Sequence, residues 1–231
     1  MKKEENKLQK IYNLVIMDKS GSMYSIANYA IDGFNEVLNG VRKSAENFKD
    51  TQIQLMSLVL FDTESIDFVA WNEDPSKVHH LNSHTYVPCA GTPLYDAMGK
   101  ALTKLRKEIG DDKDSSVVVT VITDGMENSS RDYSLSDIQA LLNELKEKGW
   151  SFAYMGTDHD VMSVTHTLNI TNVVQFCKSA EGTMSAFDKE MRARERYSRK
   201  WDLFRKMHPN ACEEDIKNFN ISSSMEYYNE D

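Results

Sequence analysis

Oxygen-bearing side chains occur in three short segments of the sequence. The first segment, DKSGS at positions 18–22, carries a carboxylate and two hydroxyls at alternate positions directly after an apolar run. The second has Thr92 just before a proline, and the third has Asp124 just before a glycine. Two carboxylates and three hydroxyls form a hard, oxygen-only ligand set, which favours Mg²⁺, Mn²⁺ or Ca²⁺ over zinc or copper. The sequence therefore predicts a site for one divalent cation, made of Asp18, Ser20, Ser22, Thr92 and Asp124.

Such a ligand set would leave the bound ion reactive toward other molecules. Mg²⁺ loses its waters reluctantly and usually keeps several exchangeable positions. With few direct carboxylate ligands, the ion also keeps most of its positive charge. We therefore expect it to attract a carboxylate that another molecule supplies.

Apolar runs and amphipathic segments alternate along the chain, which favours an α/β fold with a doubly wound, mainly parallel central sheet flanked by helices. Segment 117–123 (VVVTVIT) is β-branched throughout and predicts a strand buried on both faces, whereas 65–71 alternates as an edge strand does. Thr92 and Pro93 predict a helix start capped by the threonine hydroxyl. The expected strands are 11–17, 53–61, 65–71, 117–123, 151–155 and 172–176, and the expected longer helices are 26–45, 92–105 and 135–148.

This arrangement predicts where the three segments meet. In doubly wound folds, ligands bind outside the carboxyl ends of the strands, near the point where the strand order reverses. Asp18 ends the first expected strand and Asp124 ends the strand 117–123. These two strands often flank that point, and Thr92 can reach the same crevice from the start of its helix.

The sequences DKSGSM, GTPLYDA and VITDG together resemble the metal-ion-dependent adhesion site of von Willebrand factor A (vWA) domains. The resemblance extends from about residue 11 to residue 176 and implies the Rossmann-like vWA fold. It also implies that Ser20 and Ser22 contact the metal directly and that Asp18 and Asp124 often act through water. The contact of Thr92 is expected to change with the state of the domain.

The resemblance implies a non-enzymatic, metal-dependent protein-binding module that acts as an intracellular scaffold or adaptor. Its partner would be a protein that presents an Asp or Glu carboxylate. The alternative is a magnesium-dependent phosphatase of the haloacid-dehalogenase type, but such enzymes need a second acid where this chain has Ser20. A receiver domain is a third option. The glycine-bounded serine elbow of hydrolases and a Walker loop do not occur in the sequence.

The sequence suggests four parts, namely an N-terminal segment (1–10), a vWA-like domain (11–180), a C-terminal helical extension (181–221) and a mobile acidic tail (222–231). An apolar stripe in the extension is expected to dock on the domain or on a second copy of the chain. The arginines between Arg192 and Arg199 are interpreted as a solvated helix face. The stripe contains Met184, Phe187, Met191, Tyr197, Trp201 and Phe204.

Composition narrows the possible partners and compartments. The formal net charge is −9, and no basic stretch could follow a phosphate backbone, which argues against nucleic acid. Three widely spaced cysteines without a CxxC pair fit a reducing compartment. The N-terminus lacks an apolar signal region, and no apolar stretch reaches the roughly 20 residues that span a bilayer. The expected location is the cytoplasm, without membrane contact.

Weaker signals receive ordinary explanations. The histidines near Cys89, at positions 79, 80 and 84, match no zinc-ligand spacing and are interpreted as solvated loop residues. The acids in 158–160 (DHD) are interpreted as a helix start rather than as part of the metal crevice. Glu127 and Asn128 either line the rim of the site or form a plain polar loop.

Overall fold

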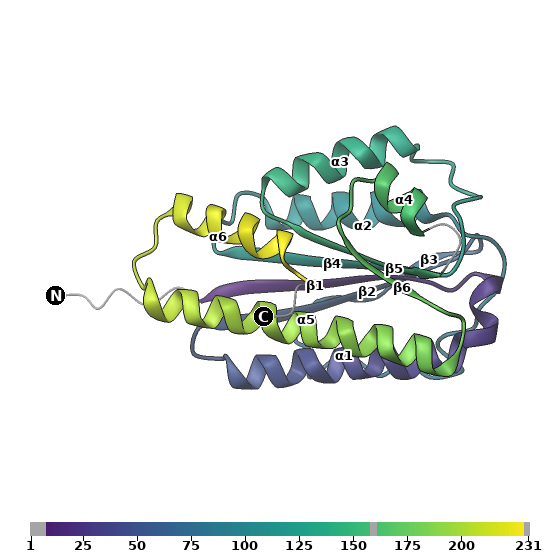
Figure 1. Ribbon diagram of the computed structural model, residues 1–231, viewed down its shortest axis with the longest axis horizontal. Helices are drawn as coiled ribbons and strands as arrows, with labels where there is room; N and C mark the ends of the chain where they lie inside the picture. Colours follow the sequence, from purple (N-terminus) through teal and green to yellow (C-terminus); the bar gives the residue numbers. More distant parts are fainter. Residues whose placement is uncertain (1–7, 158–160, 229–231) are drawn as a thin grey trace.

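The computed structural model describes residues 8–157 and 161–228. Six strands within these ranges form one sheet, in the order β3-β2-β1-β4-β5-β6 (Figure 1). All neighbouring strands are parallel except β3, which runs antiparallel to β2 at the edge. The sheet is therefore mainly parallel and doubly wound, as predicted. The strands are β1 (Gln9–Asp18), β2 (Gln52–Phe61), β3 (Ile66–Glu73), β4 (Ser115–Thr123), β5 (Ser151–Thr157) and β6 (Asn172–Phe176).

Helices cover both faces of the sheet (Figure 1). One face packs against α1 (Ala27–Asn47) and α5 (Ala180–Met207), and the other against α2 (Leu94–Ile109), α3 (Leu135–Glu147) and α4 (Val161–Thr167). A short 3₁₀ helix, η1 (Gly21–Ile26), joins β1 to α1, and α6 (Glu213–Met225) follows α5. None of the helices in the described ranges is long and apolar enough to cross a bilayer.

The central strand β4 shows why the sheet is covered on both sides. Val118 and Ile122 belong to the core beneath α1 and α5, whereas Val119 and Val121 belong to the core beneath α2 and α3. A strand without polar alternation has no solvent face, so its burial requires helices on both sides. The alternating strand β3 is instead half exposed, with Phe68 at the surface, as predicted for an edge strand.

The C-terminal helix α5 docks on the domain, as the apolar stripe predicted. Phe187, Tyr197 and Trp201 are buried in the core beneath α1, although Met184 is exposed. A β-carbon added at Gly33 of α1 would lie 2.3 Å from the Phe187 ring, so this glycine permits the close approach of α1 and α5.

The interpretation of the arginine run as a solvated face is wrong for Arg194. This side chain is buried, and its Nε donates to Glu190 Oε1 at 2.7 Å while Nη1 donates to Asn13. Thr120 of β4 also donates to Glu190. A charged side chain can be buried here because a carboxylate and neutral acceptors satisfy its donors.

The prediction of a mobile tail from residue 222 is wrong for the segment up to Tyr228. Helix α6 continues to Met225, beyond the expected end of the helical extension at 221. Tyr227 and Tyr228 are buried, and both hydroxyls donate to Glu190, at 3.0 and 2.6 Å. The C-terminal helices therefore share the core of the sheet.

Candidate metal-binding site

The first predicted segment leaves the carboxyl end of β1 and enters η1. The Asp18 side chain is fully buried, with Oδ1 accepting from the Ser20 amide and Oδ2 accepting from Thr123 Oγ1, both at 2.6 Å. Ser20 is the N-cap residue of η1, but its hydroxyl makes no capping hydrogen bond. Its Oγ instead lies 3.0 Å from Ser22 Oγ. The two hydroxyls therefore face each other rather than the free amides of the helix.

Asp124 reaches this segment because β4 is the parallel neighbour of β1. Ser22 Oγ donates to Asp124 Oδ1 at 2.5 Å, which joins positions 102 residues apart in the sequence. The other carboxylate oxygen, Oδ2, is buried and accepts no hydrogen bond from the described residues. Lys178 Nζ lies 2.8 Å from it. A buried anionic oxygen whose only nearby partner is a cation is a position where positive charge is favourable.

Thr92 does not cap its helix, contrary to the prediction. Helix α2 begins at Leu94 with Pro93 as its N-cap residue and without a side-chain capping bond. Thr92 is buried, and its backbone is held by Asn128, whose Oδ1 accepts from the Thr92 amide at 3.0 Å and whose amide donates to the Thr92 carbonyl. The threonine hydroxyl therefore remains available to the site.

The loop after β4 fixes the start of α2. Glu127 accepts hydrogen bonds from the amides of Tyr95, Ser129 and Ser130, at 3.0, 2.8 and 2.7 Å. Together with Asn128, it connects the loop that carries Asp124 to the segment that carries Thr92. The sequence alone allows either the rim of the site or a plain polar loop for both residues, and their contacts give them a positioning role.

Gly125 marks the point where the three segments converge. A β-carbon added here would lie 3.2 Å from Ser22 Oγ, 3.3 Å from Thr92 Oγ1 and 3.9 Å from Asp18 Oδ2. Side-chain oxygens from the first two segments therefore lie close to the backbone of the third, and the Asp124 carboxylate joins them through its hydrogen bond with Ser22. The structure brings the five predicted residues together at the carboxyl end of β1 and β4.

A further segment that sequence reasoning missed supports the first loop from outside. Tyr86 donates its hydroxyl hydrogen to the Asp18 carbonyl at 2.5 Å, and the Cys89 amide donates to the Lys19 carbonyl at 2.8 Å. Lys19 in turn lies 3.0 Å from the buried carboxylate of Asp62. No spacing in the sequence identifies Tyr86, and Lys178, which follows the last strand at the same edge, has no distinguishing pattern either.

The site concentrates negative charge away from water. Burial raises the pKa of Asp18 to about 6, against the hydrogen bonds from Thr123 and Ser20, and the nearby charge of Asp124 adds to the increase. A divalent cation would relieve this cost by neutralising the two carboxylates. The donor set, the buried Oδ2 of Asp124 and the close approach of the Ser22 and Thr92 hydroxyls at Gly125 all fit such an ion.

The other sequence candidates do not form a metal cluster. Within the described ranges, no three His, Cys, Asp or Glu side chains lie together as metal ligands. His79 and His84 are exposed, and His80 contacts Arg42 and Asn39. Residues 158–160, interpreted as a helix start, lie outside the described part of the chain.

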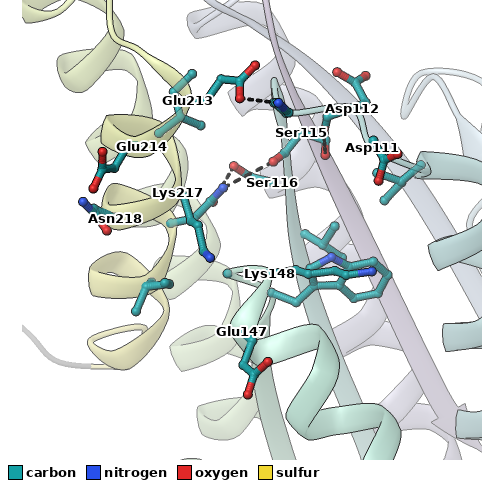
Figure 2. A pocket seen from close by; sticks show the side chains of 18 of the residues that line it. Asp111, Asp112, Ser115, Ser116, Glu147, Lys148, Glu213, Glu214, Lys217 and Asn218 are labelled. Carbon is teal, nitrogen blue, oxygen red and sulfur yellow. Dashed lines mark hydrogen bonds and ion pairs between the residues drawn. The ribbon is translucent and has the colours of Figure 1, made fainter.

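A separate pocket of about 900 Å³ lies at the opposite end of the sheet. It is bounded by the start of β4 and by residues of α3 and α6, and Figure 2 shows Lys148 and Lys217 among its side chains. Asn220 of α6 accepts from Ser116 at 2.7 Å and closes one side. The pocket contains none of the five site residues.

Comparisons with known proteins identify the fold. No protein-family model matches the chain, and no curated protein sequence does. Among solved structures, the vWA domain of SpRpn10 has a TM-score of 0.55 and 9% identity, covering 77% of this chain and 94% of that one. The vWF domain of the type V pilus tip protein Mfa5 from Porphyromonas gingivalis has a TM-score of 0.54 and 11% identity, covering 80% and 95%.

A third structure is proximal thread matrix protein 1 from the mussel byssus, solved with a zinc-occupied MIDAS motif. It has a TM-score of 0.54 and 13% identity, covering 80% of this chain but only 45% of the mussel protein. At these identities the similarity concerns the fold. The sheet order, the flanking helices and these matches agree, and this chain has the fold of a von Willebrand factor A domain.

Proposed function

We propose that this protein is a metal-dependent protein-binding module. One divalent cation, with Mg²⁺ as the first candidate, would be held by Asp18, Ser20, Ser22, Thr92 and Asp124. The observation that carries the proposal is the convergence of Ser22 Oγ, Thr92 Oγ1 and Asp18 Oδ2 around Gly125. When bound, the cation supplies an electrophilic position for a carboxylate of the partner.

The chain's own residues would divide the work. The serine and threonine hydroxyls are neutral ligands, so they would hold the ion without cancelling its charge. Asp18 is fixed by the Ser20 amide and by Thr123, and it therefore contributes charge in a set orientation. Asn128 would hold Thr92 in place through the two backbone contacts described above.

Several observations support binding over phosphatase chemistry. Both Asp18 oxygens already accept hydrogen bonds, and the side chain is fully buried, which is unsuited to attack on a phosphoryl group. Ser20 stands where that mechanism needs a second acid. The vWA fold also hosts a metal-loaded adhesion motif in the mussel protein. A role as an intracellular scaffold or adaptor is part of the proposal.

Metal titration tests the proposal directly. Isothermal titration calorimetry with Mg²⁺ and Mn²⁺ is expected to give one site per chain in the wild type and none in Asp18→Ala or Ser22→Ala. Asp50→Ala is a matched control, because Asp50 is exposed and lies next to the amino end of β2. Equal titrations in all four proteins would reject the site.

A second experiment tests the partner. Affinity capture from lysate, with and without EDTA, is expected to yield proteins that are lost on chelation and also lost with Asp124→Ala. Partners that stay bound under both conditions would show that binding does not use the cation. Hydrolysis of a generic aryl phosphate, measured with Mg²⁺, tests the alternative phosphatase function. Turnover by the wild type that disappears in Asp18→Asn would favour the phosphatase.

A further inference from the structure

Lys178 stands between the last strand and the long C-terminal helix. It follows Phe176, where β6 ends, by two residues, and precedes Ser179, the N-cap residue of α5. The Ser179 side chain accepts from the Gly182 amide at 3.1 Å, which fixes the start of α5. The backbone of Lys178 is therefore held at the carboxyl edge of the sheet, beside the candidate site.

The Lys178 ammonium lies beside Asp124, one of the proposed metal ligands, where a bound cation would also interact with the carboxylate. Nζ lies 2.8 Å from Asp124 Oδ2, and among the described residues no other group donates to that oxygen. The other Asp124 oxygen is occupied by Ser22 at 2.5 Å. The Asp124 side chain is fully buried, whereas that of Lys178 is 40% exposed. The two groups differ in freedom: the carboxylate is fixed, and the lysine can leave toward solvent.

The geometry points to Lys178 as a built-in competitor of the divalent cation. This inference rests on the function proposed above and concerns the regulation of the same site. In the metal-free protein, Lys178 neutralises Asp124. When the cation binds, the partly exposed lysine withdraws toward solvent, and the fixed Asp124 carboxylate then faces the ion alone. Lys178 thereby lowers the metal affinity and limits occupancy to higher cation concentrations.

Electrostatics give the size of the effect. The charge of the lysine ammonium and that of a divalent cation, about 5 Å apart in a water-like dielectric, repel each other. This repulsion would weaken the binding constant of the cation about tenfold. Removal of the lysine charge also ends its direct competition for Asp124. Because Lys178 is partly exposed, its ion pair adds little to folding stability, and its loss leaves the fold intact.

The test compares three lysine variants by calorimetric titration with Mn²⁺ and Mg²⁺. Lys178→Met keeps the stem without the charge and is expected to bind metal about tenfold more tightly than the wild type. Lys178→Arg keeps the charge and is expected to stay within about threefold of the wild type. Lys43→Met removes a charge from an exposed position on α1 and is the control, with unchanged affinity.

A second readout does not need a fitted affinity. The rise in melting temperature caused by a fixed Mn²⁺ concentration is expected to be larger for Lys178→Met than for the wild type, with similar values in EDTA. Equal or weaker metal binding by Lys178→Met would overturn the inference and assign the lysine an orienting role. Absence of metal binding by the wild type would instead reject the proposed function, and this inference with it.

Discussion

Asp18→Asn is expected to change stability in opposite directions without and with a divalent cation. In the metal-free protein, the buried carboxylate has a pKa of about 6, raised from 3.8 mainly by burial. The stability that protonation gives is complete below about pH 4 and is lost as the pH rises through 6. A shift of about two pKa units corresponds to about 3 kcal/mol at pH 7.5.

Asparagine is neutral at every relevant pH and has nearly the same shape. Its amide oxygen can still accept from the Ser20 amide, but it loses the acceptor that now serves Thr123, at a cost of about 1 kcal/mol. The net effect at pH 7.5 in EDTA is a gain of about 2 kcal/mol in the free energy of unfolding. Because wild-type Asp18 is more easily protonated at pH 5, the gain is expected to shrink there.

Urea denaturation measures this effect. In EDTA, Asp18→Asn is expected to have the higher midpoint at pH 7.5 and a smaller advantage at pH 5. With Mg²⁺ at 100 times its dissociation constant, the wild type gains about 2.7 kcal/mol and the variant gains nothing, so the order reverses. A variant that is destabilised in EDTA by the same amount at both pH values would refute the reasoning.

Three further predictions concern other contacts. Gly125→Ala places a methyl group 3.2 Å from Ser22 Oγ. Calorimetric titration is expected to show metal binding at least tenfold weaker, with an unchanged circular dichroism spectrum. An unchanged metal affinity would contradict the convergence of the three segments at Gly125. Arg194→Ala leaves Glu190 buried without its cation and is expected to lower the free energy of unfolding by about 3–5 kcal/mol, as measured in urea. A loss below about 1 kcal/mol would show that the hydroxyl donors of Thr120, Tyr227 and Tyr228 suffice for Glu190. Truncation after Met225 removes the hydroxyls of Tyr227 and Tyr228, which donate to Glu190, and is expected to lower the free energy of unfolding by about 2–4 kcal/mol. An unchanged free energy of unfolding would mean that the tail does not stabilise the core.

The sequence predicts the sheet well because its strands carry local signals. The β-branched run of β4 specifies burial on both faces, and the alternation of β3 specifies an edge. The convergence of Asp18 and Asp124 also follows from the sequence, since parallel strands end at the same edge. In these cases the residue pattern and the tertiary environment agree.

The errors have a common physical cause. Arg194 and the tail residues Tyr227 and Tyr228 look like surface residues, because the segments around them are rich in polar and charged residues. Their burial depends on Glu190, which lies four residues before Arg194 but 37 and 38 residues before the tyrosines. Local pattern cannot show such partners, because only the folded chain brings them together.

The prediction that Thr92 caps its helix is wrong for a related reason. Threonine before proline is a good local helix start, yet here the loop after β4 takes over through Asn128. Local capping preference therefore yields to contacts made across the site. Lys178 was missed because a lysine after a strand has no special pattern until Asp124 is placed beside it.

The central claim is that oxygen ligands from three segments hold one cation. Anomalous X-ray diffraction from crystals of the wild-type protein grown with Mn²⁺ tests it most directly. The account predicts a single strong manganese peak among the side-chain oxygens of Ser22, Thr92 and Asp124, absent in Asp18→Ala crystals. A map without a peak there, or with its peak beside the exposed histidines His79 and His84, would contradict it.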